Sequence, residues 1–207
     1  DGQEAIGNNN VTYNLAQSLI ASGVLNSIDE KGNITSTDFL DRISLPSGIS
    51  PEAALEAAAT TKASDIATSP NNDPSEVKKY FESVASIYQK YPLLNERSDI
   101  LILVQALQSN DYGKLAELDP VIQSLTSITA ELKHLPAPSE YRDFAVREIN
   151  YVFKTKRALE IFRSTPNDPL ATALILRPRL DLLAEVAKFH ADTREELKAK
   201  GILAAAK

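Results

Sequence analysis

The 207-residue chain contains no cysteine, and this absence excludes several kinds of chemistry. Without thiols there are no disulfides, no thiolate metal sites and no cysteine nucleophile. Histidine is nearly as scarce, with two residues in the whole chain, so histidine-based hydrolytic and metal sites are hard to assemble. The sequence also has no glycine-rich phosphate loop, no nucleophile elbow and no HExxH motif. We therefore expect a protein that is not an enzyme and that needs no cofactor.

Methionine is absent too, so the sequence lacks an initiator residue. A start residue, a signal peptide or a membrane anchor upstream of Asp1 would each account for this, and the residues leave the three open. Within the chain, the densest apolar run is "ILILV" at 100–104, far shorter than the ~18 residues that span a bilayer. No transmembrane segment is expected between Asp1 and Lys207.

Glycine is sparse, with seven residues, and this favours helices. Apolar residues recur at helical spacing in three long segments, 74–91, 114–135 and 139–164, and a fourth helix is predicted from about 169 to 200. The run at 100–104 is interpreted as a buried helix. The fold class predicted is all-α: an antiparallel bundle of four to five long helices over residues 69–207. A loop-rich, loosely packed acidic helical arm over 1–68 precedes it, with an opening helix at 10–25 and an alanine-rich helix ending near Thr61.

Two similar stretches, "SPNNDPSEV" at 69–77 and "STPNDPLAT" at 164–172, are interpreted as helix starts and not as an internal repeat, since their flanks differ. In each, an aspartate can cap a helix whose first residue is proline, and Asp119–Pro120 supplies a third case. Glu76, three residues after Asp73, predicts a capping box. At the other end of the chain, Gly201 predicts a helix stop.

Proline inside the last helix predicts a local distortion. Pro178 removes one backbone hydrogen bond, so a kink or break is expected between Leu174 and Pro178.

Charge is unevenly distributed along the chain. Residues 1–76 carry 11 acidic and 3 basic side chains, a balance of −8, whereas residues 77–207 carry 17 acidic and 19 basic, a balance of +2. A nucleic-acid-binding protein should be basic over a whole face, so nucleic acid is not an expected partner. The difference also indicates that the first third of the chain is distinct in kind.

A basic surface in the third long segment is the candidate docking site. Arg147, Lys154, Lys156 and Arg157 are interleaved with aromatic residues there. They are interpreted either as an ordinary solvated helix face or as a surface that docks an acidic partner, which could be this protein's own acidic arm.

Two metal hypotheses compete with simpler interpretations. Glu131 and His134 have the i, i+3 spacing of carboxylate-bridged metal bundles, but the second such motif is missing, so His134 is interpreted as a surface histidine at a helix C-terminus. The segment 29–40 resembles a calcium loop, but Lys31 occupies a ligand position in either frame. No metal is therefore predicted.

Three stretches carry a resemblance to a known family: "DIATSPNNDPSEVKKYFESVASIYQKY", "LPAPSEYRDFAVREIN" and "NDPLATALILRP". Over about residues 65–190 the chain resembles a family of uncharacterised proteins, predicted to be exported or membrane-anchored, from bacteria with very small genomes. "RPRL" at 177–180 departs from the family's pattern. The resemblance implies a helical domain outside the cytoplasm, and it carries over no functional residues.

The function expected is therefore a non-enzymatic, extracytoplasmic protein-interaction or scaffolding domain, an accessory part of an envelope, pilus or secretion assembly. The alternative is a helical bundle that binds a small apolar ligand or a metal between its helices. An enzyme that uses two converging carboxylates is the third hypothesis.

Overall fold

The computed structural model describes residues 21, 52–91, 93 and 98–203. These residues are mostly helical, which confirms the all-α fold class. Most of the opening helix predicted at 10–25 lies outside them, as does the calcium-like segment at 29–40.

Along the chain the helices and strands are α2 (Glu52–Glu56), η3 (Ala63–Asp65), β1 (Thr68–Ser69), α3 (Pro74–Lys90), α4 (Asp99–Ser109), η4 (Tyr112–Leu118), α5 (Asp119–His134), β2 (Ala137–Pro138), η5 (Ser139–Tyr141), α6 (Arg142–Arg163) and α7 (Pro169–Ala199). Elements labelled η are 3₁₀-helices. None of the described helices is both long enough and apolar enough to cross a membrane.

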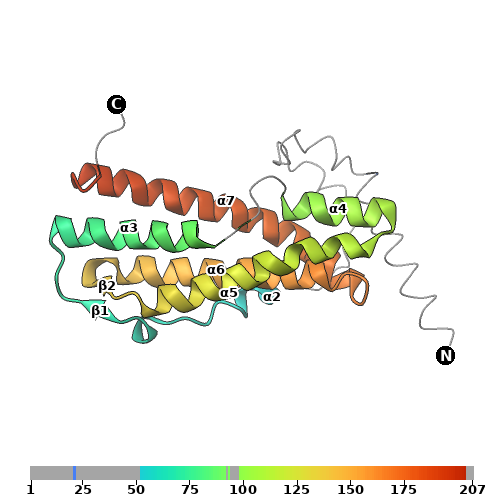
Figure 1. Cartoon of the computed structure of the whole chain (residues 1–207), viewed down its shortest axis with the longest axis horizontal. Helices are drawn as coiled ribbons and strands as arrows, with labels where there is room; N and C mark the ends of the chain where they lie inside the picture. The colour runs from blue at the N-terminus through green and yellow to red at the C-terminus, as the bar shows by residue number, and fades with distance from the viewer. Residues whose placement is uncertain (1–20, 22–51, 92, 94–97, 204–207) are drawn as a thin grey trace.

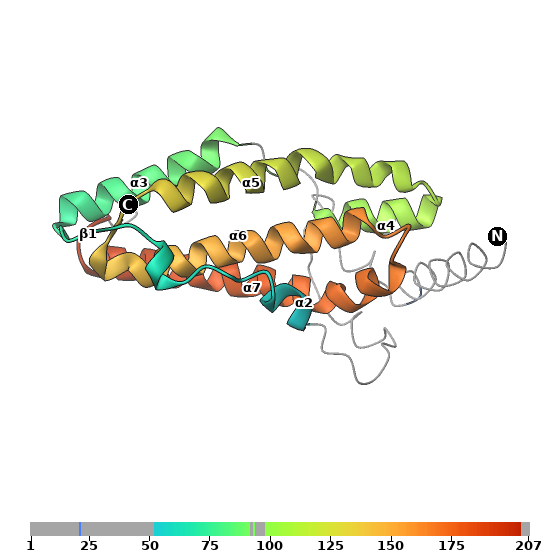
Figure 2. The same cartoon turned by 90° about the horizontal axis from the view of Figure 1, so that it is seen from below.

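The long helices follow the long axis of the molecule (Figure 1). Figure 2 shows α6 between α5 and α7, and α6 packs against both. The helices α3 and α4 lie toward opposite ends of the long axis in both views. As a result α6 is the central helix, and its residues contact neighbours on several sides.

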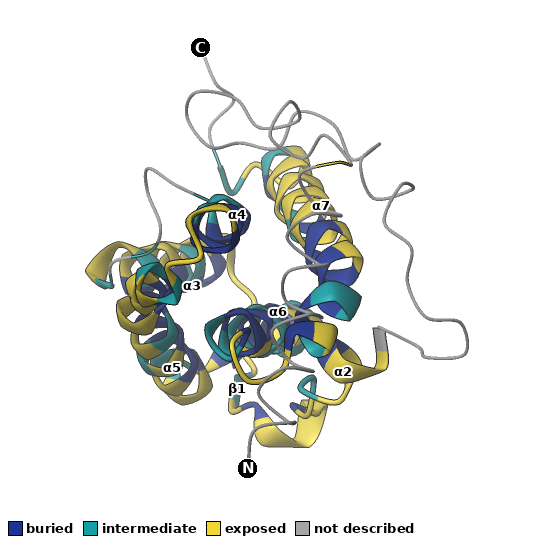
Figure 3. Cartoon of the chain, turned by 90° about the vertical axis from the view of Figure 1, so that its right-hand side faces the viewer, coloured by how far each residue is buried: buried dark blue, intermediate teal, exposed yellow. Residues whose placement is uncertain are grey.

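Buried residues face the interior that these helices share (Figure 3). The run at 100–104 lies within α4, and Ile100, Ile102, Leu103 and Val104 are almost completely buried, which confirms the predicted buried helix. Helical spacing places these side chains against neighbouring helices, where burying each one contributes about 1.5–3 kcal/mol. These aliphatic side chains form part of the core at this end of the molecule.

The chain also contains a short parallel strand pair, which the sequence did not predict. Thr68–Ser69 pairs with Ala137–Pro138, and the Ala137 amide donates to the Ala67 carbonyl at 2.9 Å. Two residues are too few to show an alternating apolar pattern, so periodicity could not have revealed them. The pairing holds the segment before α3 against the turn between α5 and α6.

The alanine-rich helix near the start of the described residues is shorter than predicted. It ends at Glu56 and not near Thr61. Beyond this end, the Asn150 side chain holds Thr61, because it accepts from the Thr61 amide and donates to the Thr61 carbonyl, both at 3.0 Å. These bonds draw Thr61 out of a helical path.

Leu55 is buried, so this part of the predicted arm packs against the long helices, while the domain boundary at 68 stays a prediction.

Two Asp-Pro pairs begin helices as predicted, but their chemistry differs. The Asp168 carboxylate accepts from the Ala171 amide at 2.9 Å, which is a true N-cap of α7. The capping box predicted for Asp73 and Glu76 is wrong, since Asp73 makes no side-chain cap bond. Its amide is already bonded to the Asn71 side-chain oxygen at 2.9 Å, and Glu76 pairs with Lys79 at 2.7 Å.

The third Asp-Pro pair does not cap a helix. The long helix predicted over 114–135 begins as the 3₁₀-helix η4, and the α-helix α5 starts at Asp119 itself. The Asp119 carboxylate instead accepts from the Arg163 side chain at 2.8 Å, at the end of α6. The Asp-Pro sequence marks the change from 3₁₀ to α geometry.

The last helix continues through Pro178. Because α7 is one helix from Pro169 to Ala199, the break predicted near Pro178 is wrong, and a kink within a continuous helix stays a prediction. Pro178, Arg179 and Leu180 are all buried, so tertiary packing on this turn compensates for the missing backbone bond.

The helix stop predicted at Gly201 is confirmed. Gly201 has φ +69°, its amide donates to the Lys198 carbonyl at 2.9 Å, and the Ile202 amide donates to Leu197 at 2.9 Å. This pair of bonds is a Schellman motif, which requires the left-handed conformation that glycine adopts at no steric cost.

Replacing Gly201 with alanine is expected to destabilise the fold by about 1 kcal/mol. No atom lies within 4 Å of the position that the alanine methyl group would occupy, so the effect is purely one of backbone conformation. Gly201→Asn is the matched control, because asparagine tolerates this conformation better. Thermal unfolding should show a melting temperature about 2–4 °C lower for the alanine variant and a smaller decrease for the asparagine variant. Equal decreases for both variants would contradict this account.

Candidate functional site

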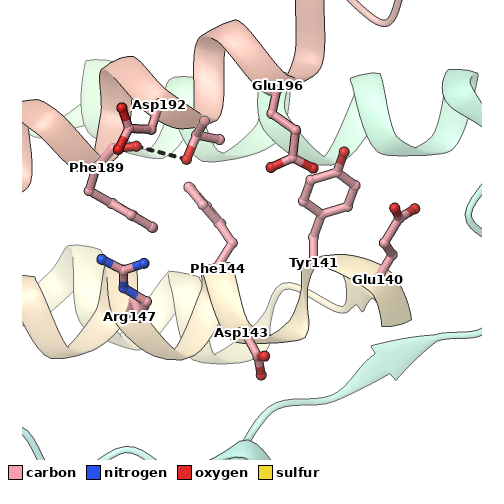
Figure 4. A pocket seen from close by; sticks show the side chains of 9 residues that line it. Glu140, Tyr141, Asp143, Phe144, Arg147, Phe189, Asp192 and Glu196 are labelled. Atoms are coloured by element: carbon pink, nitrogen blue, oxygen red, sulfur yellow. Dashed lines mark hydrogen bonds between the residues drawn. The ribbon is translucent and has the colours of Figure 1, made fainter. Parts of the chain in front are cut away.

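A surface pocket lies between α6 and α7 near one end of the molecule (Figure 4). Its volume is about 260 Å³. It is lined by aromatic, acidic and basic side chains: Glu140, Tyr141, Asp143, Phe144, Arg147, Phe189, Asp192, Thr193 and Glu196.

Helical spacing explains why these residues meet. Tyr141 ends η5, and Phe144 and Arg147 follow it in α6 at steps of three, so the three side chains lie on one side of this segment. On α7, Phe189, Asp192, Thr193 and Glu196 recur at steps of three and four and face the same space. Figure 4 shows Phe144 and Arg147 directed toward α7, whereas the Asp143 carboxylate points away from it.

Aromatic rings form the apolar part of the pocket. The rings of Phe144 and Phe189 are stacked, with centroids 5.1 Å apart. Phe144 also meets Phe81 edge-on at 4.8 Å, and Phe81 meets Tyr141 at 5.1 Å. Such pairs contribute about 0.5–1.5 kcal/mol of stability beyond that of their buried area, so these contacts hold the rings in place.

Arg147 closes one side of the pocket. Its guanidinium lies 4.3 Å from the Phe189 ring centroid and donates to the Tyr151 hydroxyl at 2.9 Å. That hydroxyl donates in turn to Glu185 at 2.8 Å. Burial raises the pKa of Tyr151, so its hydroxyl keeps its proton at neutral pH. The guanidinium is thus oriented by a stack and a hydrogen bond, and it remains exposed.

Lys200 lies just outside the pocket lining and contacts three of the lining residues. Its ammonium donates to Glu140 at 2.5 Å, pairs with Glu196 at 2.8 Å, and lies 5.0 Å from the Tyr141 ring centroid. The hydrogen bonds to Glu140 and Glu196 raise the pKa of Lys200. These contacts join the C-terminal end of α7 to η5, directly before α6.

A buried carboxylate lies on the other side of the α6–α7 contact. The Glu148 side chain is 3% exposed and accepts hydrogen bonds from the Tyr88 hydroxyl and from His190 Nε2, the latter at 2.8 Å. Glu148 follows Arg147 and His190 follows Phe189, so each helix presents one residue to the pocket and the next to this cluster.

A second buried charge pair joins α4 to α7. The Arg179 guanidinium donates to the Asp99 carboxylate at 2.7 Å, and both side chains are less than one-tenth exposed. Asp99 is the first residue of α4, where the helix dipole also favours a negative charge. The pair makes no contact with the pocket lining and has a structural role.

The four predicted docking residues do not gather at one place. Arg147 lines the pocket. Lys154 pairs with Glu56 of α2 at 2.5 Å, an acid that belongs to the predicted arm. Lys156 and Arg157 both pair with Glu160, at 2.9 and 3.9 Å. Whether these residues dock a partner stays a prediction.

Glu131 and His134, whose spacing suggested a metal site, do not act together. Glu131 accepts hydrogen bonds from Lys90 and Tyr91, and the bond from Lys90 is the main cause that lowers the pKa of Glu131. His134 is exposed. Over the described residues, no group of three or more His, Asp or Glu side chains is placed to hold a metal ion.

Sequence reasoning missed Glu148 and Arg179 as buried charges, and one signal could have found them. Both lie at core-facing positions of their helices, Glu148 beside Ile149 and three residues after Ala145, and Arg179 beside Leu180. A charged residue at such a position needs a buried partner. The partner's identity is a tertiary fact, because Tyr88 lies 60 residues from Glu148 and Asp99 lies 80 residues from Arg179.

In comparisons with known proteins, no family model, no curated protein and no solved structure matches the chain. The family resemblance over residues 65–190 therefore stays a prediction.

Proposed function

We propose that this chain is a non-enzymatic, extracytoplasmic helical domain that binds another protein through the pocket between α6 and α7. Its long helices would act as an antiparallel bundle of four to five helices, preceded by an acidic arm. Such a domain would serve as an accessory part of an envelope, pilus or secretion assembly. The size of the pocket is the observation that carries the proposal.

The pocket volume favours a single side chain as the guest. Sites for small molecules occupy roughly 300–1,000 Å³ and enclose most of the ligand. At about 260 Å³ this pocket is near the small end of that range, and its lining is partly exposed. One long side chain of a partner protein would fill it, and the surface around it would supply the rest of an interface.

The lining favours a guest with an apolar body and a positive end. Among the lining rings Phe144 is half-buried, whereas Phe189 and Tyr141 are buried. The lining carries four carboxylates and one cation, Arg147. Aromatic faces attract Lys and Arg, and the position of Lys200 over Tyr141 is an example beside this pocket. We therefore expect the partner to present a lysine or an arginine.

Blocking the pocket should abolish partner binding. Thr193→Arg places a large charged side chain in the pocket, and Ser86→Arg on α3 is its matched control. In both residues the hydroxyl donates to the carbonyl four residues earlier, at 2.8 Å. Affinity capture of the tagged full-length protein from its own cells should recover the same partner with wild type and Ser86→Arg. Thr193→Arg should reduce that partner at least about tenfold, as expected when an interface anchor is lost.

Two outcomes would contradict the proposal. The first is that all three proteins capture the same set of proteins in equal amounts. The second is that the protein fractionates entirely with the cytosol.

The aromatic lining also favours a second candidate, a small ligand in the same pocket. Native mass spectrometry of protein purified from its own cells separates the two functions. A small added mass, released on unfolding and absent from Thr193→Arg, would favour the ligand. The bare polypeptide mass would favour the protein partner.

A further inference from the structure

Glu148 is a buried carboxylate whose charge needs compensation. Removing an ionised group from water costs several kcal/mol unless it is paired and hydrogen-bonded. The Tyr88 hydroxyl donates a hydrogen bond to Glu148, but a phenol supplies no positive charge. Among the described residues, His190 is the cationic group in hydrogen-bond contact with Glu148, and only its protonated form carries a charge.

We propose that Tyr88, Glu148 and His190 form a pH-sensitive latch that holds α7 against α3 and α6 when His190 carries a proton. Each helix contributes one residue: Tyr88 from α3, Glu148 from α6 and His190 from α7. Loss of the proton leaves the neutral ring as a hydrogen-bond partner and removes the positive charge beside the buried carboxylate.

The ionisable groups around Glu148 and His190 do not prevent His190 from gaining and losing its proton. Tyr80 and Tyr88 face Glu148 from α3, and burial is the main cause that raises the pKa of both, so neither titrates near neutral pH. The hydrogen bond with Glu148 is the main cause that raises the pKa of His190, and it outweighs burial and the Arg194 charge on α7, which both lower that pKa. The His190 side chain is 43% exposed, so solvent protons reach it.

The direction of the pH dependence follows from the raised pKa. Stabilisation by the latch is fully present below the unfolded-state pKa of 6.5 and is lost as the pH rises through the folded-state value. Urea unfolding should therefore show that the wild type loses stability as the pH rises from about 6 through the raised pKa of His190. The expected change is a two- to fivefold rise in its unfolding equilibrium constant relative to His190→Gln, about the value of a partly exposed ion pair.

The chain offers a matched control because it has two histidines. His134→Gln removes the exposed histidine and should keep the wild-type pH dependence. His190→Gln keeps an N–H donor but cannot titrate, so its stability should be nearly flat over this range. A wild-type curve parallel to that of His190→Gln would overturn the proposal.

An NMR titration of the His190 ring gives an independent readout. We expect His190 to titrate above its ordinary value of 6.5, and Glu148→Gln to lower its midpoint toward that value. If Glu148→Gln does not fold, the wild-type His190 midpoint still decides. A wild-type His190 midpoint at or below 6.5 would overturn the proposal.

Discussion

Replacing Arg179 with methionine is expected to destabilise the fold by about 3–5 kcal/mol. The variant leaves the Asp99 carboxylate, whose side chain is 4% exposed, without its buried partner. Removing one member of a buried pair costs far more than the pair contributes, because the remaining charge is stranded in the interior. Urea unfolding at neutral pH measures this loss directly.

Two further variants test whether the cost comes from the stranded charge. Combining Arg179→Met with Asp99→Leu should recover most of the lost stability, since an apolar pair replaces the ionic one. Lys78→Met breaks the exposed pair with Glu82 on α3 and should change stability by less than about 1 kcal/mol. A small effect of Arg179→Met would mean that Asp99 and Arg179 are not paired as described.

Replacing Phe162 with alanine is expected to cost about 3–5 kcal/mol. Phe162 has the largest side chain among the fully buried residues and is 0% exposed, near the end of α6. Truncation removes a ring from the core and leaves a cavity that the surrounding helices fill only in part. Chemical unfolding should show a lower midpoint with an unchanged denaturant dependence.

The matched control for this core truncation lies on the surface. Leu170 is 41% exposed on α7, so Leu170→Ala should cost less than about 1 kcal/mol. Similar losses of stability in the two variants would contradict the burial of Phe162 in the core. A partly exposed leucine would then contribute as much stability as a fully buried ring.

The helical segments were largely predictable because their signals are local. Apolar residues three and four apart identified α3, α5 and α6, the apolar run at 100–104 identified the buried helix α4, and Asp168 and Gly201 marked the two ends of α7. These features depend on residues within a few positions of one another. Two errors arose where a distant residue intervened, as Asn150 does at Thr61 and Arg163 does at Asp119. The predicted capping box failed for a local reason, because the Asn71 side chain accepts from the Asp73 amide.

The pocket and the latch were not predictable from the sequence for the same reason. Phe144 and Phe189 were part of ordinary apolar patterns, and only the packing of α6 against α7 brings their rings together. The residues near His190 in the sequence do not indicate its hydrogen-bond partner, because that partner, Glu148, is 42 residues away. The spacing of apolar residues along one helix predicts which face of that helix is buried, but it does not predict which other helix packs against that face.

The most direct test of the proposed function is photo-crosslinking in the protein's own cells. A photoreactive amino acid replaces Thr193 in the pocket or, as the control, Ser86 on α3. We predict a discrete crosslinked protein from position 193, absent from position 86, and absent from 193 when Arg147→Glu and Glu196→Arg alter the charges of the pocket. Equal crosslinking from both positions, or none from position 193, would contradict the proposal that this pocket binds a partner protein.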